Sequence, residues 1–114
     1  MNKAVLVGRI TADPKIDIVN NKKRARFTVA LQRKFSKDMK IDYVSCIAKG
    51  HNAEFIEQNF TRGNNISIVG ELHTKKNENG NQTYYSTCVS VEEVSYIRPD
   101  TDFSANERGA SDES

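Results

Sequence analysis

The stretch that decides the fold runs from Asp42 to Leu72 and reads DYVSCIAKGHNAEFIEQNFTRGNNISIVGEL. Its first part, from Tyr43 to Lys49, alternates between two faces with the period of a β-strand. Its middle, from Ala53 to Phe60, spaces apolar residues as a helix does, and Asn65 to His73 alternates again. The stretch therefore predicts a strand, a short helix and a second strand.

The first of these strands is expected to bury one face and expose the other, because successive side chains of a strand point in opposite directions. The small and apolar residues form the inward face: Val44, Cys46 and Ala48. The outward face carries Tyr43, Ser45, Ile47 and Lys49. An aromatic ring and a cation on one exposed face suit a groove for a single-stranded polyanion whose bases can stack.

The short helix carries signals at both ends. The side chain of Asn52 can accept hydrogen bonds from the N–H groups of the first turn, which would cap the helix. Gly63 can adopt the left-handed conformation that commonly follows the last turn. Between them Ala53, Ile56 and Phe60 form an apolar stripe that we expect to be buried.

The rest of the chain reads as strands separated by turns. Four further strands are expected, over residues 4–10 (with Gly8 at a bend), 15–19, 25–31 and 83–94. Within 25–31 the inward residues are Phe27, Val29 and Leu31, and the outward ones are Arg26, Thr28 and Ala30. Within 65–73 the inward residues are Ile66, Ile68, Gly70 and Leu72. Asn20-Asn21 and Asn79-Gly80 mark turns.

A single helix between the third and fourth strands of the barrel is the plan of the OB-fold, an all-β, five-stranded Greek-key barrel that is partly open. The strand pattern alone also permits an SH3-like barrel, and the position of the helix favours the OB-fold. The length fits one domain, which we place at residues 1–99. Residues 100–114 are acidic and almost free of apolar groups, so we expect a disordered tail.

Charge is divided unevenly along the chain. Residues 1–99 hold 16 Lys and Arg against 10 Asp and Glu, a net charge of +6. Residues 100–114 hold 1 against 5, a net charge of −4. A basic body with an acidic tail is common among nucleic-acid binders, although a solvated surface with a disordered end has the same composition. In a binder, the tail is expected to compete with DNA for the basic groove.

Several classes of protein lack support in the sequence. The two cysteines, Cys46 and Cys88, lie far apart and outside any Cys/His cluster, so we expect free thiols and no zinc or other metal site. No cofactor motif, nucleophile–base arrangement or phosphate-cradling glycine loop is present. No apolar run has the length of a signal peptide or a membrane span, so a cytoplasmic location is expected.

Four blocks of the sequence together resemble a known family. They are NKAVLVGRITADP (2–14), DYVSCIAKGHNAEF (42–55), RGNNISIVGELHTKK (62–76) and TYYSTCVSVEEVSYI (83–97). In this order they are similar to the bacterial-type single-stranded DNA-binding proteins, including phage and plasmid members. The resemblance implies a cytoplasmic homo-oligomer, usually a tetramer, that wraps single-stranded DNA in replication, recombination or repair and has no catalytic activity.

The resemblance also implies which residues bind. The family stacks bases on aromatic residues at four main positions, and Phe35 and Tyr43 match two of them. Lys49 and Asn77 stand at the other two, so two stacking positions are missing, and Tyr84 lies near the second. The family commonly ends in an acidic, Pro-Phe-tipped peptide that recruits partner enzymes, whereas this chain ends in GASDES without that tip.

Seven cations are expected to contact phosphates without reading sequence: Lys3, Arg9, Arg24, Lys34, Lys49, Lys75 and Lys76. Two alternatives remain open. One is an OB-fold accessory protein of the replication-restart type, which acts mainly through protein partners and tends to be dimeric. The other is a small nuclease, against which the absence of an acidic metal cluster argues.

Overall fold

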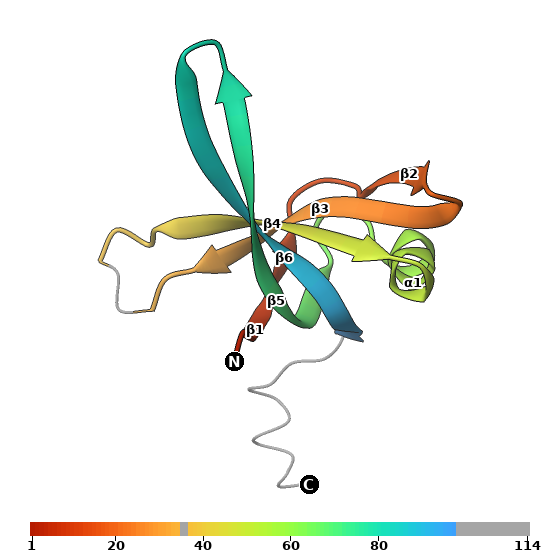
Figure 1. Cartoon of the computed structure of the whole chain (residues 1–114). Helices are drawn as coiled ribbons and strands as arrows, with labels where there is room; N and C mark the ends of the chain where they lie inside the picture. The colour runs from red at the N-terminus through yellow and green to blue at the C-terminus, as the bar shows by residue number, and fades with distance from the viewer. Residues whose placement is uncertain (35–36, 98–114) are drawn as a thin grey trace, which may run out of the picture.

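The computed structural model describes residues 1–34 and 37–97, which form six strands and one helix (Figure 1). The strands are β1 (Ala4–Ile10), β2 (Lys15–Val19), β3 (Lys22–Gln32), β4 (Ile41–Lys49), β5 (Asn65–Asn79) and β6 (Gln82–Ile97). The helix, α1, spans His51–Asn59. Phe35 and the acidic tail lie outside the described residues.

Five of the strands close into a ring in the order β1-β5-β6-β4-β3, because β1 also pairs with β3. That closing contact is short, with Arg9 opposite Ala30 and Ile10 opposite Val29. β2 pairs with β3 alone and stands outside the ring. In chain order α1 therefore falls between the third and fourth strands of the ring, and the predicted OB-fold is confirmed.

The core fills the inside of the ring, where the predicted alternation of β3, β4 and β5 is confirmed. Phe27 and Val29 of β3, Cys46 of β4, and Ile66 and Ile68 of β5 are all buried. Burial raises the pKa of the Cys46 thiol to about 12, with a smaller contribution from nearby Cys88. Both cysteines are free, as expected.

The prediction for Leu72 was wrong, since its side chain is 48% exposed. β5 and β6 continue beyond the ring as a long two-stranded hairpin (Figure 1). Leu72 keeps the alternation of Ile68 and Gly70, but it lies beyond Gly70, the last residue of β5 that pairs with β1. The hairpin ends at Gly80, whose φ of +64° suits the tight turn that Asn79-Gly80 predicted.

Two glycines allow strands to approach closely where the ring bends. A Cβ on Gly8 of β1 would lie 2.4 Å from the carbonyl oxygen of Ala30. A Cβ on Gly70 would lie 2.2 Å from the carbonyl oxygen of Ser90, beside the irregular register between Val69 and Gly70. Any larger residue would push the paired strands apart at these points.

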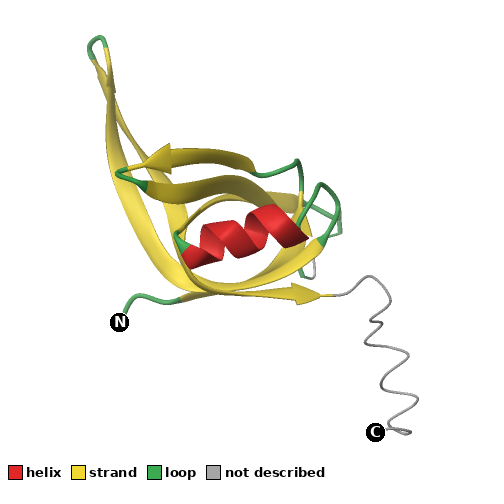
Figure 2. Ribbon diagram, turned by 90° about the vertical axis from the view of Figure 1, so that its right-hand side faces the viewer, coloured by secondary structure: helices red, strands yellow, loops and turns green. Residues whose placement is uncertain are grey.

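The helix lies across one end of the ring and buries the predicted stripe of Ala53, Ile56 and Phe60 (Figure 2). Phe60 follows the last helical residue in an extended conformation. Its ring packs edge-on against Phe55 and Tyr96, at centroid distances of 5.9 and 5.2 Å. The helix therefore seals the core that the strands leave open at this end.

Both predicted helix caps were wrong. The N-cap is Gly50, whose φ of +63° turns the chain from β4 into α1 within one residue, so Asn52 already lies inside the helix. The Asn52 amide donates instead to the carbonyl oxygen of Glu92, at 3.2 Å. Gly63 lies beyond the end of the helix and donates its N–H to the carbonyl oxygen of Ile10, at 2.8 Å.

Candidate nucleic-acid interface

The outward side chains of β3 and β4 form one continuous surface, which we call the β3–β4 face. Its members are the β3 residues Arg24, Arg26, Thr28 and Ala30, and the β4 residues Tyr43, Ser45, Ile47 and Lys49. Each β3 residue stands opposite one β4 residue, from the Ala30–Tyr43 pair at one end to the Arg24–Lys49 pair at the other. Tyr43 is 66% exposed, so its ring is available for stacking.

Residues of other strands extend this face in rows, since paired residues point to the same side of a sheet. Arg9 of β1, Ala30 and Tyr43 form one such row. Neighbouring strands are about 4.8 Å apart, so the Cα atoms of Arg9 and Tyr43 are separated by about 10 Å. Lys15 of β2, Arg26 and Ile47 form a second row. An exposed cation therefore lies across the sheet from the tyrosine, at Arg9, and two more lie further along the face, at Arg26 and Lys15.

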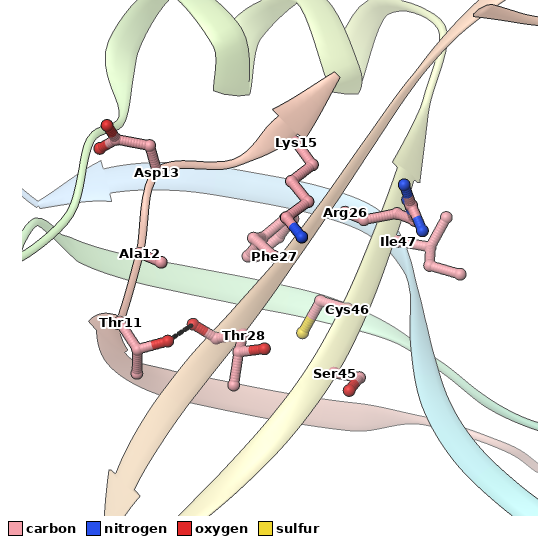
Figure 3. A pocket seen from close by; sticks show the side chains of 10 residues that line it. All are labelled: Thr11, Ala12, Asp13, Lys15, Arg26, Phe27, Thr28, Ser45, Cys46 and Ile47. Atoms are coloured by element: carbon pink, nitrogen blue, oxygen red, sulfur yellow. Dashed lines mark hydrogen bonds between the residues drawn. The ribbon is translucent and has the colours of Figure 1, made fainter. Parts of the chain in front are cut away.

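A groove of about 300 Å³ lies between the turn that follows β1 and the β3–β4 face (Figure 3). Lys15 and Arg26 extend from its walls, and Thr28 and Ser45 contribute hydroxyl groups (Figure 3). Phe27 and Cys46 also line it. A groove with cations at its rim and apolar groups beneath can hold a nucleotide, whose phosphate is charged and whose base is flat and largely apolar.

Lys15 and Arg26 were not among the residues that the sequence analysis assigned to binding. The alternation of residues 25–31 already placed Arg26 on the outward face, so that pattern was sufficient to find it. Lys15 is different, because its place beside Arg26 depends on the pairing of β2 with β3.

Asp17 restrains the arginines at the basic end of the face. Arg24 donates to both of its carboxylate oxygens, at 2.9 and 2.7 Å, and Arg26 lies at 3.6 Å. The hydrogen bonds from Arg24 lower the pKa of Asp17 below its ordinary value. Arg24 is thus held by an internal carboxylate, whereas Lys49, beside it, makes no ion pair with the residues that the structure describes.

The hairpin separates the two lysines that the sequence analysis had grouped together. Lys75 stands opposite Ser86, and Asn77 opposite Tyr84, on the side of β6 that also carries Ser90. Because Ser90 pairs with Ile47, this side continues the β3–β4 face. The reverse side of the hairpin carries Lys76 opposite Tyr85, and Lys76 also contacts Glu78 at 3.6 Å.

Tyr84 is the direct cross-strand neighbour of Asn77. Asn77 stands at a position where the resemblance implies an aromatic residue that this chain does not have. Its side chain is 54% exposed. The hairpin therefore presents an aromatic ring on the side that continues the β3–β4 face, one strand away from the expected position.

The remaining predicted cations lie elsewhere. Lys3 precedes β1 and binds the carboxylate of Glu92 at 2.5 Å, a hydrogen bond that raises the pKa of the lysine. Lys34 is exposed just beyond the end of β3. Phe35, the second predicted stacking residue, lies outside the described residues.

Features of other protein classes are missing from the part of the chain that the structure describes. Across residues 1–34 and 37–97, no three His, Cys, Asp or Glu side chains gather in a way that could hold a metal ion. No helix in those ranges is both long enough and apolar enough to cross a membrane.

Comparisons with known proteins agree with this geometry. The profile of the Single-strand binding protein family matches residues 1–97. A "Single-stranded DNA-binding protein" of Clostridium perfringens is 40% identical over 100 residues, which cover 85% of this chain and 66% of that protein. One of Staphylococcus epidermidis is 34% identical over 87% of this chain and 78% of its own length. "Single-stranded DNA-binding protein A" of Bacillus subtilis is 32% identical over 87% of this chain and 60% of its own length.

These matches do not favour the restart-type accessory protein. They extend over all six strands and the helix, and thus include every described residue of the β3–β4 face. The chain belongs to the single-strand binding protein family.

Proposed function

We propose that this protein binds single-stranded DNA without sequence preference, and that it coats and protects such strands during replication, recombination or repair. The observation that carries the proposal is the β3–β4 face, where the exposed Tyr43 ring shares a row with Arg9 and a strand with Lys49. Phosphates bind such cations, and bases stack on such rings whatever their identity. The relatives named for this activity support the same conclusion.

The proposal concerns binding alone, with no catalytic step. It places the protein with single-stranded DNA in the cytoplasm of a bacterial or phage-infected cell, because the relatives are bacterial. The acidic residues 100–114 are proposed to compete with the strand for the basic face through their charge.

Competition between DNA forms tests the proposal. Unlabelled single-stranded oligonucleotide should displace labelled oligo-dT at concentrations at least about tenfold lower than duplex of equal length, because duplex bases are already stacked on each other. Fluorescence anisotropy at fixed salt measures both. Equal displacement by the two forms would mean that a basic patch binds phosphates without using the aromatic rings.

We also propose that the protein forms a homo-oligomer, most simply the tetramer that the resemblance implies. The surface of β1 supports the oligomer, because two apolar side chains of this strand are exposed: Val5 at 69% and Val7 at 58%. Among the described strands, one edge of β1 pairs with β5 and the other pairs with β3 only at Arg9 and Ile10. An apolar edge strand with unpaired backbone groups is stabilised when a second copy covers it.

Val7→Glu is therefore expected to lower the mass of the particle in light scattering, to that of a smaller assembly or a single 12.8 kDa chain. The reason is that an unpaired carboxylate at an apolar contact is strongly unfavourable. The matched control is Ile18→Glu, at a similarly exposed apolar residue on β2, which should keep the parent mass. A mass that falls for Ile18→Glu and not for Val7→Glu would place the contact on β2 instead.

A further inference from the structure

A second concave site lies beyond the basic end of the β3–β4 face, at the turn between β2 and β3. It has a volume of about 270 Å³ and is lined by Val19, Asn20, Lys22, Lys23, Arg24 and Lys49. Four of these six residues are cations and none is acidic. We call it the turn pocket. Its chemistry is that of an anion site, because clustered cations in a concave surface attract and retain negative charge.

Two of the four cations are already balanced by carboxylates. The ammonium of Lys23 binds Glu57 of α1 at 2.5 Å, and Arg24 binds Asp17 through two hydrogen bonds. Lys22 and Lys49 make no ion pair with residues 1–34 or 37–97. The pocket thus has two cations free to take a ligand, one at the start of β3 and one at the end of β4.

Register places Lys22 on the same side of the sheet as the β3–β4 face. Alternation along β3 gives Lys22 the orientation of Arg24, Arg26 and Thr28, and Lys22 pairs with the exposed Val19 across the turn. Ala30, in the row of Tyr43, is eight residues further along β3. At about 3.3 Å per residue the two positions are about 26 Å apart along the strand, so the pocket extends the face along β3.

We propose that the turn pocket binds a backbone phosphate of the bound single strand through Lys22 and Lys49. This assignment rests on the proposed function. It adds Lys22 to the binding residues and gives the path of the DNA, which would run along β3 from the row of Tyr43 to the β2–β3 turn. Asp17 and Glu57 neutralise the two neighbouring cations, so the phosphate has two ligands rather than four.

A salt titration of oligo-dT binding tests the assignment. Each phosphate contact with a single strand contributes a slope of about −0.7 to log affinity against log salt. Lys22→Ala should make the slope less steep by up to about 0.7 and weaken binding about two- to fivefold at low salt, as expected of an exposed charge contact. Lys22→Arg should restore the parent slope, because it keeps the charge.

Lys23→Ala is the matched control, since it removes an equal charge one residue away whose ammonium binds α1. Because Glu57 already balances that ammonium, the slope of Lys23→Ala should change less than that of Lys22→Ala, and thermal melting should show that all variants fold. If the parent binds oligo-dT and Lys22→Ala keeps the parent slope, this assignment is overturned while the proposed function stands. If the parent itself does not bind, the proposed function fails.

The same titration distinguishes a strand phosphate from a small free anion. At constant ionic strength, inorganic phosphate should leave the difference between the parent and Lys22→Ala unchanged. If millimolar phosphate abolishes that difference while chloride does not, the pocket holds free phosphate and the assignment to the DNA backbone is overturned.

Discussion

Phe60→Ala is expected to be the most damaging single truncation considered, with a loss of about 3–5 kcal/mol in the free energy of unfolding. The ring is 2% exposed and lies between the end of α1 and β6, with edge-on contacts to Phe55 and Tyr96. Its removal leaves a cavity where the helix closes the barrel. For a domain of about 100 residues, the melting temperature should fall by at least about 12 °C.

Phe55→Ala is the matched control. It removes the same side chain from within α1, five residues before Phe60, but Phe55 is 37% exposed and therefore loses fewer contacts. Calorimetry or circular dichroism at one protein concentration compares the three proteins, because the melting temperature of an oligomer depends on concentration. Equal losses for the two variants would show that the contact between the rings matters, rather than the burial of Phe60.

Local periodicity was sufficient to predict most of the fold, for a physical reason. Alternation along β3 and β4 records which side of each strand meets the core, and that burial is decided residue by residue. The inward positions of Phe27, Val29 and Cys46 followed from it. So did the exposed position of Tyr43, on which the candidate interface depends.

The errors arose where two residues both fitted the same structural role, or where the alternation of a strand continued beyond the part of that strand that faces the core. Asn52 and Gly50 both fit the start of a helix, and the sharp turn out of β4 required the positive φ of glycine. Leu72 followed the alternation of β5, but its side chain is only about half covered, because the strand extends beyond the barrel. The helix-start signal does not show where β4 ends, and the alternation of β5 does not show where the barrel ends.

The composition of the interface depended on pairing between distant segments. The sequence analysis named Arg9 and Tyr43 separately, and closure of β1 onto β3 puts them in one row. Lys75 and Lys76 are adjacent in sequence, and the hairpin turns them to opposite sides. Lys15 comes to the face through the β2–β3 hairpin. Register between strands is a property of the whole barrel, so a single strand does not reveal it.

Tyr43→Ala is expected to weaken oligo-dT binding by about 1–3 kcal/mol, or about five- to 150-fold, at every salt concentration. The tyrosine ring offers an uncharged surface, and stacking on it releases no counterions from the strand. The salt slope should therefore remain that of the parent. Tyr43→Phe is the control, because it keeps the ring and should bind within a few-fold of the parent. Anisotropy of a labelled oligo-dT measures all three.

Lys49→Ala should change the salt slope rather than the affinity at high salt. Lys49 stands at a position where the family resemblance implies an aromatic residue, so we expect this position to contribute charge in place of stacking. Its removal should make the salt slope less steep by about 0.7, with the loss of affinity confined to low salt. For the same reason, the parent should have a steeper slope and weaker binding at high salt than a relative with all four aromatic residues.

The two variants together decide whether the β3–β4 face is the binding surface, because Tyr43 and Lys49 lie on one strand and one side, six residues apart. A strand that crosses the face meets both, so each variant must alter its own quantity and leave the other intact. An unchanged slope for Lys49→Ala would remove Lys49 from the phosphate contacts. An unchanged affinity for Tyr43→Ala would move stacking to the hairpin, where Tyr84 presents an exposed ring on the same side. If neither variant has an effect, the single strand binds a different side of the barrel.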